Sequence, residues 1–161
     1  MKDKKMSLFL FITYLLLLTW VIVYKMDLSV LYGRYESGSL NLIPLAGKAV
    51  YNGVLNYPKI LFNVISFIPF GMYMEMLFRK ASWVTNLGII LLVSLVFEVW
   101  QFVFLLGIAD ITDLLANGCG AIGINIMYVL TSIWREKAYS RVNILCLSAT
   151  VFVILITYLT L

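Results

Sequence analysis

The stretch SLVFEVWQFVFLLGIADITDLLANGCGAIG, residues 94–123, decides the fold, because two apolar runs meet in it across a short polar turn. A turn this short makes the two flanking helices antiparallel neighbours in a bundle. The stretch is nearly all hydrocarbon, yet it contains three of the eight acids of the chain. Its polar side chains include Glu98, Gln101, Asp110, Asp113 and Asn117. Their concentration in so apolar a passage indicates a shared role.

The composition is that of an integral membrane protein. Of the 161 residues, 63% are hydrophobic and 12% are charged, and the mean hydropathy is +0.99. Soluble domains carry about 25% charged residues. The net charge of +4 does not predict nucleic-acid binding, because the basic residues lie mostly at the ends of apolar segments. With no histidine and no CxxC pair at Cys119 or Cys146, the sequence favours neither a zinc site nor a redox motif, and we expect no metal or cofactor.

Five apolar segments approach the roughly 20 residues that a helix needs to cross a bilayer. They are residues 7–24, 60–78, 84–106, 114–134 and 143–161. Because an open sheet edge cannot persist in lipid, we predict these segments as helices. The fold class is therefore all-α, a single membrane domain over residues 1–161 with about five transmembrane helices. The loop after the first helix, rich in tyrosine, is expected to be structured, either as a connector at the membrane surface or as a functional lid that caps the bundle.

The distribution of lysine and arginine predicts the orientation. With the N-terminus in the cytoplasm, the inner segments carry eight basic residues and the outer segments four. The eight are Lys2, Lys4, Lys5, Arg79, Lys80, Arg135, Lys137 and Arg141. The four are Lys25, Arg34, Lys48 and Lys59. This excess predicts a multi-pass protein of the cytoplasmic membrane with its C-terminus outside, so that loop 25–59 and turn 107–112 face outward.

Helical spacing brings the polar residues of the opening stretch together. Glu98 and Gln101 are three residues apart and share a helix face, with Glu98 about 12 Å below the outer helix end. Asp110, Asp113 and Asn117 also share a face, and Asp113 is predicted as the N-cap of the next helix. On antiparallel neighbours these side chains converge on one outward-opening pocket. Two interpretations stay open: the residues cap and join helices around a satisfied buried acid, or they form a functional site, as intramembrane acids usually do.

Other features of the helices have structural explanations. Ala116, Gly120 and Gly123 form a stripe of small residues, which allows a close helix contact. In the second predicted helix, Pro69 can introduce a kink and free backbone carbonyls, and Asn63 adds a polar side chain.

Four motifs follow one another along the chain: NLIP (residues 41–44), NVISFIPFG (63–71), FEVWQF (97–102) and DITDLLANGCGAIG (110–123). With these motifs in this order, the sequence resembles the VanZ-like membrane family over essentially its whole length. The resemblance implies a role in resistance to teicoplanin, a lipid-bearing glycopeptide antibiotic, in the cell envelope of Gram-positive bacteria. It supplies no established catalytic residues. The motifs add Asn41 and Asn63 to the candidate pocket.

One position departs from the pattern of many family members, which carry an arginine three residues before the first aspartate of the last motif. This chain has Gly107 there, as does the glycopeptide-resistance branch of the family. The pocket then lacks a cation of its own, and we expect Arg34 or Lys48 from the outer loop to supply one.

Three functions from different classes fit these features. The first is a protein that binds a membrane lipid, the acyl tail of a lipoglycopeptide or a lipid-linked wall precursor. The second is an intramembrane enzyme acting on an envelope lipid, with Glu98 and Asp110 or Asp113 as acid and base. The third, a small transporter, is disfavoured because the chain shows no inverted repeat. The sequence leaves the ligand, any catalysis and the oligomeric state open.

Overall fold

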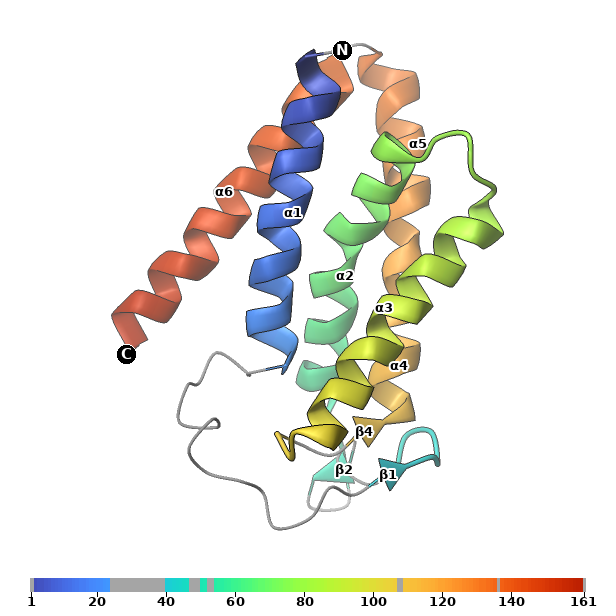
Figure 1. The fold of residues 1–161 in the computed structure, drawn as a ribbon, viewed down its shortest axis with the longest axis vertical. Helices are drawn as coiled ribbons and strands as arrows, with labels where there is room; N and C mark the ends of the chain where they lie inside the picture. Colours follow the sequence, from blue (N-terminus) through green and yellow to red (C-terminus); the bar gives the residue numbers. More distant parts are fainter. Residues whose placement is uncertain are drawn as a thin grey trace.

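The computed structural model describes residues 2–23, 40–46, 50–51, 54–106, 109–135 and 137–160. Over these ranges the chain forms a bundle of long helices with two small strand pairs at one end (Figure 1). The helices are α1 (Lys2–Val23), α2 (Tyr57–Leu77), α3 (Trp83–Val103), α4 (Ile111–Gly118), α5 (Ile122–Trp134) and α6 (Lys137–Thr160). A 3-10 turn, η3 (Cys119–Ala121), joins α4 to α5. The prediction of an all-α fold is confirmed.

Four helical stretches in the described part of the chain are long and apolar enough to cross a membrane. They are Lys4–Val23, Tyr57–Leu77, Trp83–Val103 and Ile111–Trp134, the last of which combines α4, η3 and α5. Helix α6 follows with 24 residues. The protein is therefore a multi-pass membrane protein.

The strands fasten the loop after α1 to the turn before α4. Strand β1 (Leu40–Asn41) pairs in parallel with β4 (Ala109–Asp110), with Asn41 opposite Asp110. Strand β2 (Val50–Tyr51) pairs antiparallel with β3 (Val54–Leu55). Both pairs lie at the end of the bundle where α2 begins and α3 ends (Figure 1). We call this the strand end, and the opposite end, where α1 begins, the N-terminal end.

Glycines let α2 contact η3 and α5 backbone to backbone. A Cβ added at Gly123 would lie 2.0 Å from the carbonyl oxygen of Ile68, and one at Gly120 would lie 2.3 Å from the Cβ of Phe67. From the other side, a Cβ added at Gly71 of α2 would lie 2.5 Å from the carbonyl oxygen of Gly120. The stripe of small residues is thus a helix contact, as its structural explanation predicted.

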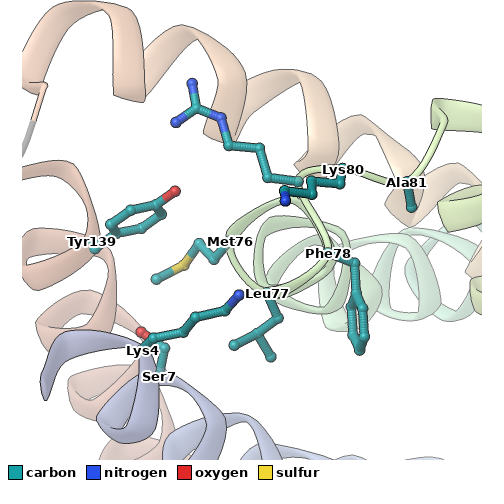
Figure 2. A pocket seen from close by; sticks show the side chains of 9 residues that line it. Lys4, Ser7, Met76, Leu77, Phe78, Lys80, Ala81 and Tyr139 are labelled. Atoms are coloured by element: carbon teal, nitrogen blue, oxygen red, sulfur yellow. The ribbon is translucent and has the colours of Figure 1, made fainter. Parts of the chain in front are cut away.

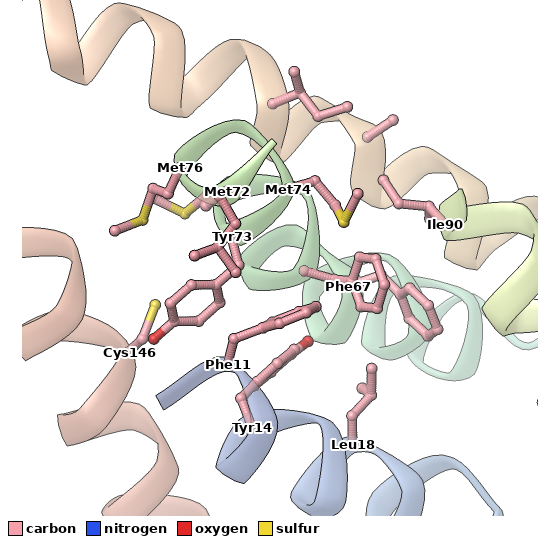
Figure 3. Packing of buried hydrophobic residues seen from close by; sticks show 14 of the residues in the cluster. Phe11, Tyr14, Leu18, Phe67, Met72, Tyr73, Met74, Met76, Ile90 and Cys146 are labelled. Atoms are coloured by element: carbon pink, nitrogen blue, oxygen red, sulfur yellow. The ribbon is translucent and has the colours of Figure 1, made fainter. Parts of the chain in front are cut away.

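Aromatic side chains join α1 to α2 in the core (Figure 3). The rings of Phe11 and Phe70 meet edge to face with their centroids 5.3 Å apart. The hydroxyl of Tyr14 donates a hydrogen bond to the carbonyl of Ser66, in the turn of α2 that precedes Pro69. These contacts fix α1 against the middle of α2, and therefore fix where α1 ends relative to the polar residues of the strand end.

Candidate functional site at the strand end

The polar residues singled out in the sequence lie at the strand end and are withdrawn from the surface. Glu98, Gln101, Asp110, Asp113 and Asn117 each expose at most 9% of their surface. Burying ionised carboxylates is unfavourable unless each has partners. The partners therefore decide which residues form a site and which join helices.

Asp110 connects three elements. Its Oδ1 accepts hydrogen bonds from the backbone N–H of Thr112, at 2.9 Å, and from Nδ2 of Asn41, at 3.0 Å. The first bond makes Asp110 the N-cap of α4, an interaction worth about 1 kcal/mol. The second bond holds β1 beside β4. Asn41 also donates to the carbonyl of Ala46 at 2.9 Å, so that the NLIP segment folds back on itself against the start of α4.

The predicted N-cap, Asp113, is wrong. Asp110 ends strand β4 with an extended backbone (φ −130°, ψ 120°), and its side chain reaches the N–H of Thr112. Helix α4 therefore begins at Ile111, which places Asp113 inside its first turn. A carboxylate in this turn is still favoured by the helix dipole.

Glu98 reaches the same point from α3. Its Oε2 accepts the backbone N–H of Asp110 at 2.8 Å. The glutamate therefore fastens the end of α3 to the residue that caps α4. Because the bond uses only one oxygen of the carboxylate, the acid keeps capacity to accept a further proton or hydrogen bond.

Lys59 supplies the cation. Its Nζ lies 2.8 Å from Oδ2 of Asp113 and 3.8 Å from Oδ2 of Asp110. The side chain of Lys59 is 26% exposed, that of Asp113 12% and that of Asp110 0%. Arg34 or Lys48 was expected in this role, but both lie outside the described residues. The charged cluster, as we define it, consists of Lys59, Glu98, Asp110 and Asp113.

Lys59 was not predicted as a site residue, because the sequence pattern placed it in the outer loop and not in the second helix. The sequence NYPK, residues 56–59, could have revealed that a helix begins before Lys59. In the structure Asn56 accepts the N–H of Lys59 at 3.2 Å, and a proline occupies the first turn. Both features mark a helix N-terminus. With Lys59 in the helix, spacings of four place it on one face with Asn63 and Phe67.

The remaining amides have other partners. Nε2 of Gln101 donates to the carbonyl of Ile22, in the last turn of α1, at 2.7 Å. Nδ2 of Asn117 donates to Oγ of Ser94 at 2.8 Å and so joins α4 to α3. Asn63 is buried on α2, on the face that contacts η3 through Phe67. The structure thus brings Glu98, Asp110, Asp113 and Asn41 together. The hydrogen bonds that Gln101 and Asn117 donate connect neighbouring helices.

The charge balance of the cluster limits its chemistry. Three acids face one lysine, so a proton or a cationic group is favoured near Glu98. Nζ of Lys59 and Oδ1 of Asp113 are buried, and the exposed part of Lys59 is its carbon stem. In the described part of the chain, no group of three or more His, Cys, Asp or Glu residues has a geometry that could hold a metal ion.

Comparison with known proteins gives one consistent result. Residues 11–135 match the VanZ/LLP1 family, a range that includes the whole charged cluster. The chain is also 31% identical to Protein VanZ of Enterococcus faecium over 159 residues, covering 98% of this chain and 94% of that protein. No solved structure matches the chain.

Proposed function

The chain belongs to the VanZ/LLP1 family, and from this premise we propose that it is a cell-envelope membrane protein that supports resistance to teicoplanin. In the proposed mechanism it binds an acyl chain, either that of the antibiotic or that of a lipid-linked wall precursor, next to the charged cluster. The cytoplasmic membrane is its proposed location, with the strand end facing outward.

One juxtaposition supports this proposal more than any other. An apolar groove of about 370 Å³ runs along α3 between Leu95 and Phe104 and includes Trp100. The same turns of α3 carry Glu98 on their buried side. An acyl chain in the groove would therefore lie on the exposed face of α3, at the level of Glu98 and on the opposite side of the helix from it.

The arrangement of basic residues supports the proposed orientation. Among the residues that the structure describes, seven basic ones lie at the N-terminal end: Lys4, Lys5, Arg79, Lys80, Arg135, Lys137 and Arg141. Lys59 is the described basic residue of the strand end. Since cytoplasmic segments are enriched in lysine and arginine, the N-terminal end is proposed to face the cytoplasm.

Antibiotic tolerance tests the proposal directly. Teicoplanin carries a fatty acyl chain and vancomycin carries none, so expression in a susceptible Gram-positive host should raise tolerance to teicoplanin clearly more than to vancomycin. The terminal dipeptide of the wall precursor should stay unchanged. Equal protection against both drugs would refute acyl-chain binding.

Glu98→Gln is the decisive variant, with Glu75→Gln as its matched control. Glutamine keeps an oxygen that can accept the N–H of Asp110, so the fold is retained while the charge is lost. Glu75 pairs with Arg79 at 4.0 Å in the last turns of α2, far from the cluster. Tolerance should disappear only in Glu98→Gln at equal abundance in the membrane. Of the other variants, Gln101→Ala, Asp110→Asn and Asp113→Asn should impair tolerance, and Asn117→Ala should impair it less.

An intramembrane enzyme acting on an envelope lipid is the second candidate. This candidate is favoured because two carboxylates have different local environments: Glu98 accepts a backbone hydrogen bond, whereas Asp113 pairs with Lys59. Acids whose environments differ are suited to separate acid and base roles. Mass spectrometry of envelope lipids, with and without the protein, separates the two candidates, because binding alone leaves the lipid masses unchanged.

A further inference from the structure

A second pocket lies at the N-terminal end of the bundle, remote from the charged cluster. It has a volume of about 450 Å³ and is bordered by the start of α1, the turn between α2 and α3, and the start of α6. Figure 2 shows Lys4 and Tyr139 beside Met76 and Leu77, with Lys80 on the far side. The proposed function makes no use of this pocket.

Its charge is entirely positive among the residues described. Lys4, Arg79 and Lys80 line it, and no acidic side chain does. Arg79 has an acidic neighbour outside the lining, Glu75, at 4.0 Å. Within the described ranges, Lys4 and Lys80 form no ion pair. Three cations in one lining, two of them without an acidic partner among the described residues, favour an anionic ligand.

The rest of the lining is suited to a lipid. Met76 and Leu77 provide apolar walls, and the hydroxyl-bearing ring of Tyr139 contributes an amphipathic side. The turn that carries Arg79 and Lys80 connects two membrane-spanning helices, which end at Leu77 and begin at Trp83. The pocket therefore lies at the level of the membrane surface, where phospholipid phosphates and the first methylenes of their chains are found.

We propose that this pocket binds the phosphate of an anionic membrane phospholipid in the leaflet at the N-terminal end. Basic pockets between transmembrane helices are a recurrent way of recognising such head groups. The apolar walls distinguish this ligand from a free phosphate ion, which has no use for them. A lipid bound here would join α6, through Tyr139, to α1 and to the α2–α3 turn.

Each lysine near a membrane surface contributes about 1 kcal/mol to the binding of anionic lipid, and this value predicts how much affinity a substitution removes. Removing one of them should weaken the binding of an anionic lipid about 5-fold, and removing two should weaken it about 30-fold. Lys4→Gln with Lys80→Gln removes the two cations that have no acidic partner among the described residues. Lys5→Gln with Lys137→Gln is the matched control, because both lysines are exposed at the same end but do not line the pocket.

The experiment titrates lipid into the purified full chain in a neutral detergent and follows the thermal unfolding midpoint by tryptophan fluorescence. Dioleoyl-phosphatidylglycerol should raise the midpoint, and dioleoyl-phosphatidylcholine should raise it much less. The lining double variant should need about 30-fold more phosphatidylglycerol for half of the shift. The control double variant should behave like the original chain.

Three outcomes would overturn the proposal. Equal shifts with both lipids would show that no anionic head group is recognised. An equal loss in the control variant would reduce the effect to general charge attraction. A matching shift with inorganic phosphate alone would assign the pocket to a soluble anion. If the double variant does not accumulate, Lys80→Gln alone should show the smaller, 5-fold effect, and its absence would count against the site.

Discussion

Replacing Lys59 by methionine should destabilise the strand end more than the loss of any surface charge. The substitution keeps an unbranched side chain, one heavy atom shorter, but leaves Asp113 and Asp110 without the cation that lies 2.8 and 3.8 Å from their carboxylates. Removing one partner of a fully buried ion pair costs about 3–5 kcal/mol. Nζ of Lys59 is itself buried, but 26% of the side chain is exposed, so water can reach the acids once the ammonium group is removed, which offsets part of this loss. We therefore expect the free energy of unfolding to fall by about 2–3 kcal/mol.

A double-mutant cycle separates the ion pair from the other effects of the substitution. Asp113→Asn alone removes one acid and leaves Lys59 near Asp110, so it should cost about 1 kcal/mol. The double variant Lys59→Met/Asp113→Asn should lose less free energy of unfolding than the two single variants lose together. The difference, which is the coupling energy between the two residues, should be about 1–2 kcal/mol. Unfolding in mixed detergent micelles, followed by tryptophan fluorescence, measures all four free energies. Lys5→Met, an exposed change in α1, should stay within about 0.5 kcal/mol of the original chain.

Strict additivity would refute this reasoning. If the two single costs simply add, Lys59 and Asp113 do not interact, and the charged cluster has no cation in solution. A loss in Lys5→Met as large as that in Lys59→Met would mean that the assay reports net charge and not the pair.

Three further predictions concern packing, loop docking and orientation. Gly123→Ala should lower the free energy of unfolding by about 1–3 kcal/mol, because its Cβ would meet the backbone of α2, whereas Gly88→Ala, with nothing within 4 Å, should not lower it. Asn41→Ala removes the hydrogen bonds to Asp110 and to the Ala46 carbonyl and should cost about 1–2 kcal/mol in the same unfolding assay; no loss would mean that β1 does not hold β4. A cysteine at position 107, with the two native cysteines replaced, should react with an impermeant maleimide on intact cells, and reaction only after permeabilisation would reverse the orientation.

Much of the fold could be predicted from hydropathy alone. Apolar runs near 20 residues long and a short turn between α3 and β4 are sufficient to predict antiparallel membrane helices. The break at η3 was not predicted, because Cys119 and Gly120 continue an apolar helical pattern and nothing local marks a change of helix type. The glycine contact was predicted as packing, but its partner on α2 was not, since a sequence pattern identifies a face and not the helix that covers it.

The site was predictable as a set of residues but less so as a set of contacts. Spacing on α3 correctly places Glu98 and Gln101 on the buried side. It cannot show that Gln101 bonds to the carbonyl of Ile22, because that contact spans 79 residues and depends on where α1 ends. For the same reason the contact between Lys59 and Asp113 could not be predicted, because it depends on α2 beginning at Tyr57.

The glycine contact and the charged cluster are parts of one arrangement. Helix α2 and the α4–η3–α5 stretch run in the same direction, with Phe67 against Gly120 and Lys59 against Asp113. About two helical turns separate these residues on each side, so the backbone contact sets the register of the ion pair. A slip by one turn would move Lys59 by about 5.4 Å and break the 2.8 Å contact with Asp113. The small residues therefore serve the site as well as the packing, because only side chains without bulk allow the register in which a lysine of α2 neutralises the acids of α4.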